Sequence, residues 1–514
     1  MIHPAEDVVL NIHSWHASPG LFTDLYQLTM AQGYVAAGVA DTEACFHLSF
    51  RGYPFGGGYA VCCGLAQALE YLDSLAFAPH DIDYLRTLRG NDGGPLFAEE
   101  FLGHLASFRF TADVDAVPEG TVVFPHEPLL RVSGPVVACQ LAETALLNIV
   151  NFQTLVATKA ARVCQAAGGD PVIEFGLRRA QGPDGGLSAA RAAYVGGCAA
   201  TSNTLAGRVF GIPVAGTHAH SWVMLFDSEA DAFAAYADAM PNNATFLVDT
   251  YDTLAGVRHA AEAGARLRER GHAMIGVRID SGDLAWLSRR AREILDEAGL
   301  GDARIVASNE LDEHLIGSLK DQGAAVDVWG VGTKLVTADG QGALGGVYKL
   351  SAVRQAGGEW EPRVKVSEQT AKVTTPGVLG VRRYVGDGSA PGAGGSRPLA
   401  DMVYDVNDPP APDREAVMID PADPTRRKRF AADAPYEELL VPAVRAGERV
   451  YDSPTLDEIA ERARVQLGAL DPSQRRFLNP HTYPVGLERG VHGVRTRLIM
   501  RAREGEKRTG EDSR

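Results

Sequence analysis

Reactive side chains gather in short polar segments between Val172 and Thr333. One segment contains His220, whose unprotonated imidazole has a free lone pair and can act as a base, a metal ligand or a nucleophile toward phosphorus. Two others contain Asp249 and Asp280, carboxylates of the kind that hold Mg²⁺ and ribose hydroxyls. Together these residue types indicate a site for a phosphorylated anion and a metal ion.

Two histidines occur in the segment GTHAH at 216–220. A single histidine in a turn is usually a polar side chain whose hydrogen bonds are satisfied locally. Here the neighbouring segments also carry reactive groups, which favours a functional role for His220. For His218 two alternatives stay open, an idle side chain and a second ligand.

The segment RIDSGD at 278–283 combines Arg278 with two carboxylates and a turn glycine, Gly282. An arginine can bind a carboxylate or a phosphate through two parallel hydrogen bonds. The simpler alternative is a capping turn with a surface salt bridge, an interaction that contributes little stability. We expect Arg278 and Asp280 to be catalytic, and Ser281 and Gly282 to contact phosphate.

A glycine-rich segment, GVGT at 330–333, follows a buried apolar run. Glycine lets main-chain amides approach a phosphate at the start of a helix, so Gly332 and Thr333 are candidate phosphate-binding residues. The segment lacks the Walker pattern of a nucleotide-binding loop.

In the segment EFGLRR at 174–179, Phe175 precedes Arg178 and Arg179. An aromatic ring beside two guanidinium groups could stack a flat heterocycle and neutralise charge attached to it. The default alternative is a core phenylalanine followed by solvated arginines.

Repeated units of a short aliphatic strand, a polar tip and a helix-like stretch must position these groups. Parallel strands place all their C-terminal tips along one rim, so distant residues can meet there. We therefore predict an α/β fold, an irregular TIM-like (β/α) barrel of about six to seven units. An open doubly wound sheet is the alternative, but no G-x-G-x-x-G follows an early strand. The tips are Glu174, Thr217, Asp249, Asp280, Ser308 and Gly332, which lie 24 to 43 positions apart.

The strand-and-helix rhythm predicts a barrel domain over residues 135–344. Alternating strand-like runs on either side predict an α+β domain built from both chain ends, residues 1–134 and 345–480. Residues 481–514 form an extension whose charged end we expect to be disordered. A glycine- and proline-rich stretch at 386–398 predicts a flexible surface loop.

Composition narrows the class of protein. A chain of 514 residues with 45% hydrophobic content can bury a large core. A net charge of −16 argues against nucleic acid as a partner, because such binding needs a basic face. Six dispersed cysteines, no secretory signal and apolar stretches broken by polar residues predict a cytoplasmic protein that binds no membrane.

With these segments in place, the chain resembles the nicotinate phosphoribosyltransferases, type II phosphoribosyltransferases that join nicotinate to 5-phosphoribosyl 1-pyrophosphate with consumption of ATP in NAD biosynthesis. The resemblance covers most of the chain up to Leu350 and is looser beyond it. The matching segments are TDLYQLTMAQGY (23–34), EFGLRRAQGPDGG (174–186), GTHAH (216–220), VDTYDT (248–253), GVRIDSGDL (276–284), GVGT (330–333) and LGGVYKL (344–350).

The resemblance implies that ATP phosphorylates His220 and that breakdown of the phosphohistidine is coupled to nucleotide formation. It also implies a homodimer with shared sites, in which Tyr26 of the neighbouring subunit and Phe175 enclose the pyridine ring. By the same resemblance, Arg278 and Thr217 contact nicotinate, and Asp249 and Asp280 contact ribose, pyrophosphate or Mg²⁺. Gly332 and Thr333 contact the 5′-phosphate. Arg178 and Arg179 contact pyrophosphate or the pyridine carboxylate.

Asn203 bears on the choice of substrate, because related nicotinamide-using enzymes carry an aspartate at the matching position. An aspartate would repel the carboxylate of nicotinate, so Asn203 favours the acid. Two alternatives to the nicotinate enzyme stay open at this point. They are a nicotinamide-specific relative and a non-catalytic sensor of phosphoribosyl compounds.

Overall fold

The computed structural model describes residues 14–369, 372–386 and 396–511. The chain forms two compact units, one made from both chain ends, Met1–Leu155 with Ala343–Arg514, and one made from Val156–Gly342. Helix α6 (Glu143–Ala167) carries the chain from the first unit into the second. The loop expected at 386–398 falls mostly outside the described residues.

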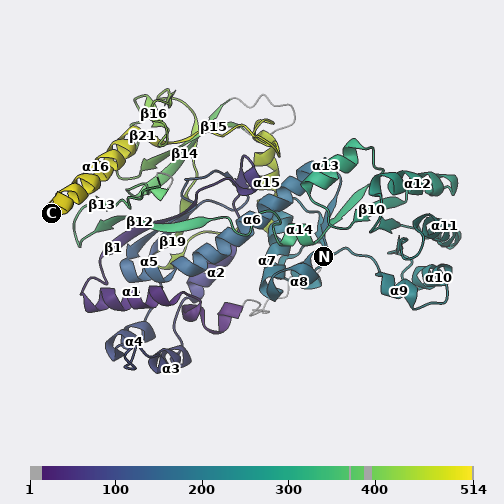
Figure 1. Ribbon diagram of the computed structural model, residues 1–514, viewed down its shortest axis with the longest axis horizontal. Coiled ribbons are helices and arrows are strands. Elements are labelled where there is room, and N and C mark those ends of the chain that lie inside the picture. Colours follow the sequence, from purple (N-terminus) through teal and green to yellow (C-terminus); the bar gives the residue numbers. More distant parts are fainter. Residues whose placement is uncertain (1–13, 370–371, 387–395, 512–514) are drawn as a thin grey trace. The chain divides into compact units, whose positions relative to one another are not determined.

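A six-stranded parallel sheet is the centre of the Val156–Gly342 unit (Figure 1). All residues of β8 and β11 are buried, as expected for parallel strands covered on both faces. Every strand pair is parallel, so the C-terminal ends share one edge. The spatial order is β7 (Ala200–Thr201), β6 (Val172–Glu174), β11 (Val328–Val331), β10 (Arg304–Ser308), β9 (Gly276–Ile279) and β8 (Thr245–Leu247).

The predicted closed barrel is not what this sheet forms. Beyond β7 the arc is extended by one isolated parallel bridge, Thr201 to Val214. Among the described residues no ladder joins that end to β8 at the other edge. The segment after Val214 approaches β8 without forming a ladder with it, so the six strands form an open half-barrel in a mixed α/β fold.

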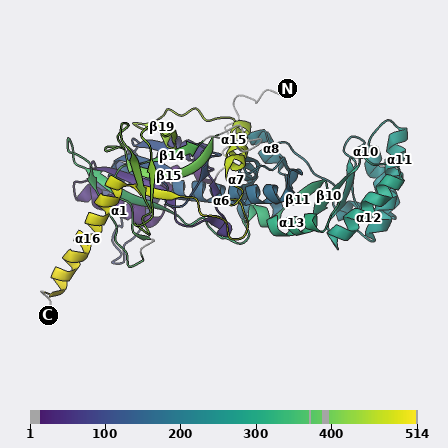
Figure 2. The ribbon, with the colours of Figure 1, turned by 90° about the horizontal axis from the view of Figure 1, so that it is seen from above.

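Five helices of this unit begin at a polar residue whose side chain caps the first turn. Asn203, Ser228, Asp252, Asp283 and Asp312 each accept a hydrogen bond from a main-chain N–H of the first helical turn. Helices α10, α11 and α12 lie next to one another in both views (Figures 1 and 2). The helices are η4 (Leu177–Arg179), α7 (Gly182–Val195), α8 (Thr204–Phe210), α9 (His220–Met224), α10 (Glu229–Ala239), α11 (Thr253–Glu269), α12 (Leu284–Glu297), α13 (Glu313–Asp321) and α14 (Thr333–Val336).

The unit built from both chain ends contains two larger sheets and a small one. In the first sheet β1 pairs with β12 as well as with β5, so strands from the two halves of the chain share one ladder. Its order is β13 (Glu361–Pro362), β12 (Gly346–Arg354), β1 (Glu43–Phe50), β5 (Leu130–Pro135), β3 (Asp113–Ala116), β19 (Val441–Arg445) and β20 (Glu448–Arg449). The second is β17 (Arg427–Phe430), β16 (Ala416–Ile419), β21 (Val485–Glu488), β15 (Arg397–Asp405), β14 (Leu379–Gly386) and β18 (Tyr436–Glu438), and the third pairs β2 (Ala60–Val61) with β4 (Val122–Val123).

The helices of this unit include the last element of the chain, α16, which extends to Glu511 where the sequence predicted a disordered end. Its first turns pack on β15, β16 and β21, and the following Arg, Glu and Lys residues have high helix propensity. Among the described residues, every helix is too short or too polar to span a bilayer. The helices are η1 (Ser14–Ala17), η2 (Pro19–Leu21), α1 (Leu25–Ala36), η3 (Pro54–Gly56), α2 (Leu65–Ser74), α3 (Pro79–Thr87), α4 (Glu99–Ala106), α5 (Val136–Leu141), α15 (Leu456–Ala469) and α16 (Arg489–Glu511).

Candidate active site

Arg278, near the end of β9, is the centre of a polar cluster at the C-terminal edge of the parallel sheet. Its Nε donates to Ser308 Oγ at 2.8 Å, its Nη1 to Thr217 Oγ1 at 3.1 Å and its Nη2 to Asp280 Oδ1 at 2.8 Å. Ser308 also donates to Asp280. The cluster therefore joins residues from the ends of β9 and β10 with Thr217, which follows the isolated bridge at Val214.

The ring of Phe175 lies beside this arginine, with its centroid 5.4 Å from the guanidinium carbon. The ring also covers Gly330, where a Cβ atom would come within 2.6 Å of two ring carbons. Only a glycine on β11 therefore leaves room for the ring. Phe175 and Arg278 together form a surface suited to a flat ligand that carries negative charge.

Asp249 lies next to this cluster and fixes the turn after β9. Its Oδ2 accepts from the main-chain N–H of Asp280 at 2.9 Å and from Ser281 Oγ at 2.6 Å. Its Oδ1 is buried and has no hydrogen-bond partner. A buried carboxylate oxygen without a partner is costly, so this atom suits a cation or a ligand donor.

The carboxylates of this site could hold magnesium only if a bound substrate and water supply the other ligands. Within the described residues no three His, Cys, Asp or Glu side chains are grouped to hold a metal ion by themselves. Mg²⁺ commonly binds one or two carboxylates and fills its remaining positions with water and substrate phosphate oxygens. Asp249, with its free Oδ1, and the adjacent Asp280 match that mode of binding.

His220 is the first residue of helix α9, at the same edge of the sheet. Its Nδ1 lies 3.1 Å from Thr250 Oγ1, so the hydroxyl can orient the ring. The side chain is half-buried, and no other hydrogen bond of its ring occurs among the described residues. The other ring nitrogen, Nε2, is then the atom left to react.

The structure gives His218 a structural role, whereas the sequence left open whether it is idle or a second ligand. Its ring is buried between Phe233, Tyr236 and Phe246, and Nε2 accepts from the main-chain N–H of Leu247 at 3.2 Å. Burial lowers the pKa of His218, and the nearby charges of Arg278 and His220 lower it further. The side chain thus ties the segment bearing His220 to strand β8 across the open edge of the sheet.

Asn203 is buried and caps helix α8. Its Oδ1 accepts from the main-chain N–H groups of Leu205 and Ala206, and its Nδ2 lies 3.4 Å from Gly186 O. A further chain of hydrogen bonds runs from its main-chain N–H to Thr201 Oγ1, and from Thr201 to Glu174. Glu174, whose pKa is raised by burial, accepts in turn from the N–H of Gly176, so Asn203 supports the turn that holds Phe175.

Other predicted residues lie at strand ends but outside the Arg278 cluster. Arg178 and Arg179 follow β6 in η4 and are exposed. Gly332 precedes α14, and Thr333 Oγ1 donates to Glu310 Oε1 at 3.2 Å. Gly282 has φ +80° and completes the turn after β9.

Tyr26 lies in the other unit, on helix α1, and 48% of its surface is exposed. Partial desolvation raises its pKa to about 12, with Glu143 and Asp24 adding to the effect. Leu25 and Met30 on the same helix are also exposed. Helix α1 therefore presents an apolar surface to its surroundings.

The sequence placed Ser308 at a strand tip and Thr250 in the segment 248–253, but assigned neither of them a role in the site. A short hydroxyl side chain at a strand end was the only signal. Asn309 and Glu310, directly after β10, adopt positive φ of 99° and 45°. Such strained backbone is concentrated at functional sites, and only the structure shows it here.

Comparison with known proteins gives a consistent result. Models of the nicotinate phosphoribosyltransferase N-terminal and C-terminal domains match residues 21–151 and 392–495. Nicotinate phosphoribosyltransferase of Bacillus subtilis is 42% identical over 494 residues, 94% of this chain and 97% of its own. The enzyme of Caenorhabditis elegans is 35% identical, with 95% of each chain covered.

Solved structures agree with these sequence matches. The crystal structure of human nicotinic acid phosphoribosyltransferase has a TM-score of 0.80 at 33% identity and covers 93% of this chain and all of its own. Nicotinate-nucleotide pyrophosphorylase from Pyrococcus furiosus has a TM-score of 0.66 at 22% identity, over 90% of this chain and 99% of its own, which shows a shared fold.

Proposed function

The chain belongs to the nicotinate phosphoribosyltransferase family of NAD biosynthesis, and we propose that it couples its reaction to ATP through His220 at the edge of the parallel sheet. The family and the activity predicted from the sequence are thus confirmed. The reaction joins nicotinate to 5-phosphoribosyl 1-pyrophosphate and yields nicotinate mononucleotide and pyrophosphate. The remaining assignments concern which residues carry it out.

The hydrogen bond between His220 Nδ1 and Thr250 supports the coupling to ATP, and the hydrogen bonding of Arg278 carries the assignment of the nicotinate site. Arginine has five N–H groups, and the contacts to Ser308, Thr217 and Asp280 use one on each nitrogen. Within the described part of the chain, one N–H on Nη1 and one on Nη2 are therefore left for a ligand such as a carboxylate, which can accept from both. Arg278 and Thr217 bind the carboxylate of nicotinate while Phe175 holds the flat ring.

Asp249 and Asp280 would hold Mg²⁺, together with the pyrophosphate oxygens of the substrate. When bound, this ion neutralises negative charge that builds on the departing pyrophosphate. The protein's own part is to hold both carboxylates beside Arg278 and to present Ser281 and Gly282 to phosphate. Positive charge then develops on ribose C1, and the stacked pyridine nitrogen attacks it in line.

The remaining phosphate contacts come from loops at the same edge. Main-chain amides at Gly332 and Thr333 bind the 5′-phosphate at the start of α14. Arg178 and Arg179, exposed and without an ion pair among the described residues, face the pyrophosphate. Asn203 favours nicotinate over nicotinamide because its neutral side chain adds no negative charge near the Phe175 turn, to which its main-chain N–H is linked through Thr201 and Glu174.

ATP acts as co-substrate through His220. Thr250 holds Nδ1, so Nε2 attacks the terminal phosphorus of ATP, the phosphorus–oxygen bond to ADP breaks, and a phosphohistidine forms. Water later hydrolyses the phosphohistidine, and this step is coupled to release of the nucleotide.

A homodimer completes the site. The exposed aromatic and aliphatic residues of α1 are of the kind that cover a partner surface, and Tyr26 is then supplied to the ring of nicotinate in the neighbouring subunit. The six cysteines are all free thiols, which suits a cytoplasmic location.

Nucleotide formation with nicotinate and with nicotinamide, each with and without ATP, tests the proposal. We expect product from nicotinate that increases with ATP, and acid-labile label on the protein from γ-labelled ATP that His220→Ala abolishes. His272→Ala, at a partly exposed position far along the chain, is the control. Undiminished label in His220→Ala would remove the coupling proposal, and a protein that forms no nucleotide would be a sensor instead.

A further inference from the structure

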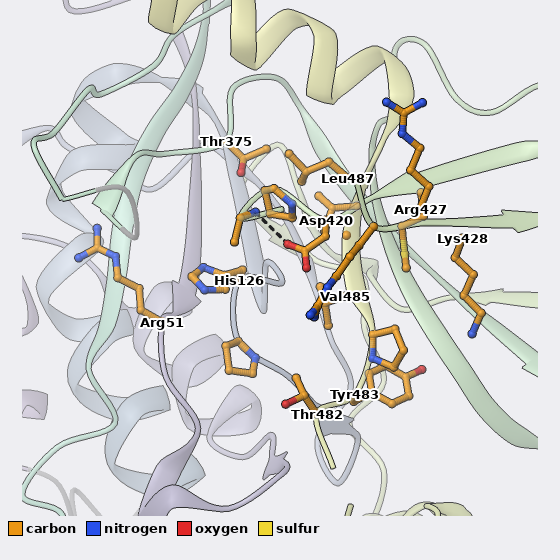
Figure 3. A pocket seen from close by; sticks show the side chains of 18 of the residues that line it. Arg51, His126, Thr375, Asp420, Arg427, Lys428, Thr482, Tyr483, Val485 and Leu487 are labelled. Atoms are coloured by element: carbon orange, nitrogen blue, oxygen red, sulfur yellow. Dashed lines mark hydrogen bonds between the residues drawn. The ribbon is translucent and has the colours of Figure 1, made fainter. Parts of the chain in front are cut away.

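A large cavity lies within the unit built from both chain ends and includes none of the residues of the candidate active site. Its volume is about 940 Å³, enough for a metabolite of nucleotide size. The wall is formed by the loop at 125–126, by β16, β17 and β21, and by α16. Figure 3 shows Arg51 and His126 on one side of it and Arg427 and Lys428 on the other.

The lining is strongly cationic in a chain of net charge −16. Among the described residues, five Arg or Lys side chains line the cavity and one carboxylate does, Asp420. Asp420 is engaged by the main-chain N–H groups of Ala422 and Asp423 and forms no ion pair with the lining cations among the described residues. The lining cations are Arg51, Arg426, Arg427, Lys428 and Arg495.

Arg495 on α16 is the most informative of these residues. Only 9% of it is exposed, and among the described residues no carboxylate pairs with it. Its Nε and Nη2 make long hydrogen bonds of 3.3 and 3.4 Å to the carbonyl oxygens of Thr374 and Val373. A buried guanidinium without a counter-charge is strongly unfavourable, so its place in a cavity wall calls for an anion.

The rest of the wall favours an anion with an apolar or aromatic part. Met418, Val485 and Leu487 line the cavity beside Tyr483. His126 approaches from the opposite side and holds a positive φ of 74°, a conformation that costs energy for any residue except glycine. Charged and apolar side chains therefore line the same cavity, as in sites that bind a phosphate group attached to an aromatic or aliphatic moiety.

We propose that this cavity is a second ligand site, which binds a phosphorylated small molecule with an aromatic or apolar body through an ion pair to Arg495. The ligand class is that of a nucleoside monophosphate. Arg427, at the exposed rim, attracts the anion, whereas Arg426 beside it is paired with Asp423, and Arg495 makes the buried contact. The site is independent of the proposed catalytic roles, since no catalytic residue lines it.

Isothermal titration of the full-length protein with AMP, and separately with inorganic phosphate, tests this proposal. The variants are Arg495→Leu and, as matched control, Arg497→Leu two positions along the same helix, where the arginine is exposed. We expect AMP to bind to the wild type and the control with affinities within twofold, and at least tenfold more weakly to Arg495→Leu. Phosphate alone should bind more weakly than AMP, because it leaves the apolar wall uncovered.

Two further measurements keep the result interpretable. Without ligand, Arg495→Leu should melt at the same or a higher temperature than the wild type, because it removes an unpaired buried charge. A melting temperature well below that of Arg497→Leu would instead give Arg495 a purely structural role. Nucleotide formation should be retained in both variants. Equal AMP affinity in all three proteins would place any binding elsewhere and overturn the proposal.

Discussion

Arg278 Nη2 donates to Asp280 Oδ1 across 2.8 Å, and the two residues stand two positions apart at the end of β9. Residues at i and i+2 of a strand point to the same side, so the strand itself brings the cation and the carboxylate together. Ser308 on β10 contacts both of them. The arginine is thereby held in place before any substrate arrives.

Replacing Arg278 with lysine should lower kcat/KM for nicotinate on the order of 100-fold, equivalent to about two charge-assisted hydrogen bonds. A lysine is a point charge that cannot contact Ser308, Thr217 and Asp280 and still offer a fork to a carboxylate. Steady-state kinetics with each substrate varied in turn will measure the loss. Arg304→Lys, exposed on β10, serves as the control, and kinetics equal to the control would contradict the role.

Thr250→Val should reduce the ATP-stimulated part of the rate about tenfold, the effect of one lost hydrogen bond of roughly 1.4 kcal/mol, and leave the rate without ATP unchanged. The hydroxyl holds His220 Nδ1, and valine keeps the shape without the bond. The measurement is the initial rate with and without ATP, beside an exposed control, Thr87→Val. Equal losses in both rates would mean that Thr250 acts on the fold and not on His220.

Gly330→Ala should destabilise the protein by about 1–3 kcal/mol and raise KM for nicotinate, because the added methyl group meets the Phe175 ring and forces it to move. Gly317→Ala is the matched control, since nothing lies within 4 Å of a Cβ there and the residue is in helix α13. That control should be neutral or stabilise by up to about 1 kcal/mol. Urea unfolding of both variants measures the loss of stability, and nicotinate saturation curves measure the change in KM.

Acidification should destabilise the protein partly through His218. Its folded pKa is lowered, so the unfolded chain binds more protons between that pKa and the ordinary value of 6.5, and stability falls as pH drops through this window. One such group contributes at most about 1.4 kcal/mol per pH unit. His218→Gln keeps an acceptor for Leu247 N–H but does not titrate, so it should lose less stability.

Urea unfolding at pH 7.5, 6.0 and 5.0 measures this difference. His47 is also buried, and burial and Arg131 lower its pKa to about 3, but it acts equally in both proteins and cancels. His272→Gln is the control. If the free energy of unfolding falls equally with pH in the wild type and in His218→Gln, protonation of His218 does not affect stability.

Asn203→Asp should keep the cap on α8, because aspartate caps a helix as well as asparagine does, but should lower stability by about 1–3 kcal/mol, because the new carboxylate is buried and replaces the amide that faces Gly186 O. The added negative charge, close to Glu174 and the Phe175 turn, should lower activity on nicotinate much more than any side activity on nicotinamide. Paired assays with the two substrates measure the ratio. Equal losses on both would count against a role in substrate choice.

The sequence predicted which residues would gather at the site because parallel strands followed by helices have a fixed direction. Arg278, Asp280, Asp249 and Thr217 each follow a short aliphatic run, and the rule that such strand ends share an edge places them together whatever the details of the loops. The family resemblance, carried by the same segments, added the reaction.

The tertiary structure determined those features of the site that require residues far apart in the chain to come close together. The sheet stays open because the segment after Val214 does not pair with β8, and His218 joins the two only through its side chain. The partners Ser308 and Thr250 and the free oxygen of Asp249 are matters of distance and burial, which no local pattern encodes.

The cationic cavity around Arg495 is a second feature that could not be predicted from the sequence. Its walls come from residues between positions 51 and 495, and each arginine alone looks like an ordinary solvated side chain in the sequence. The sequence by itself determined strand direction, helix caps and the chemistry of the strand ends, since these depend on neighbours along the chain. Which charges are buried without a partner depends on packing between distant segments, and only the folded structure determines that.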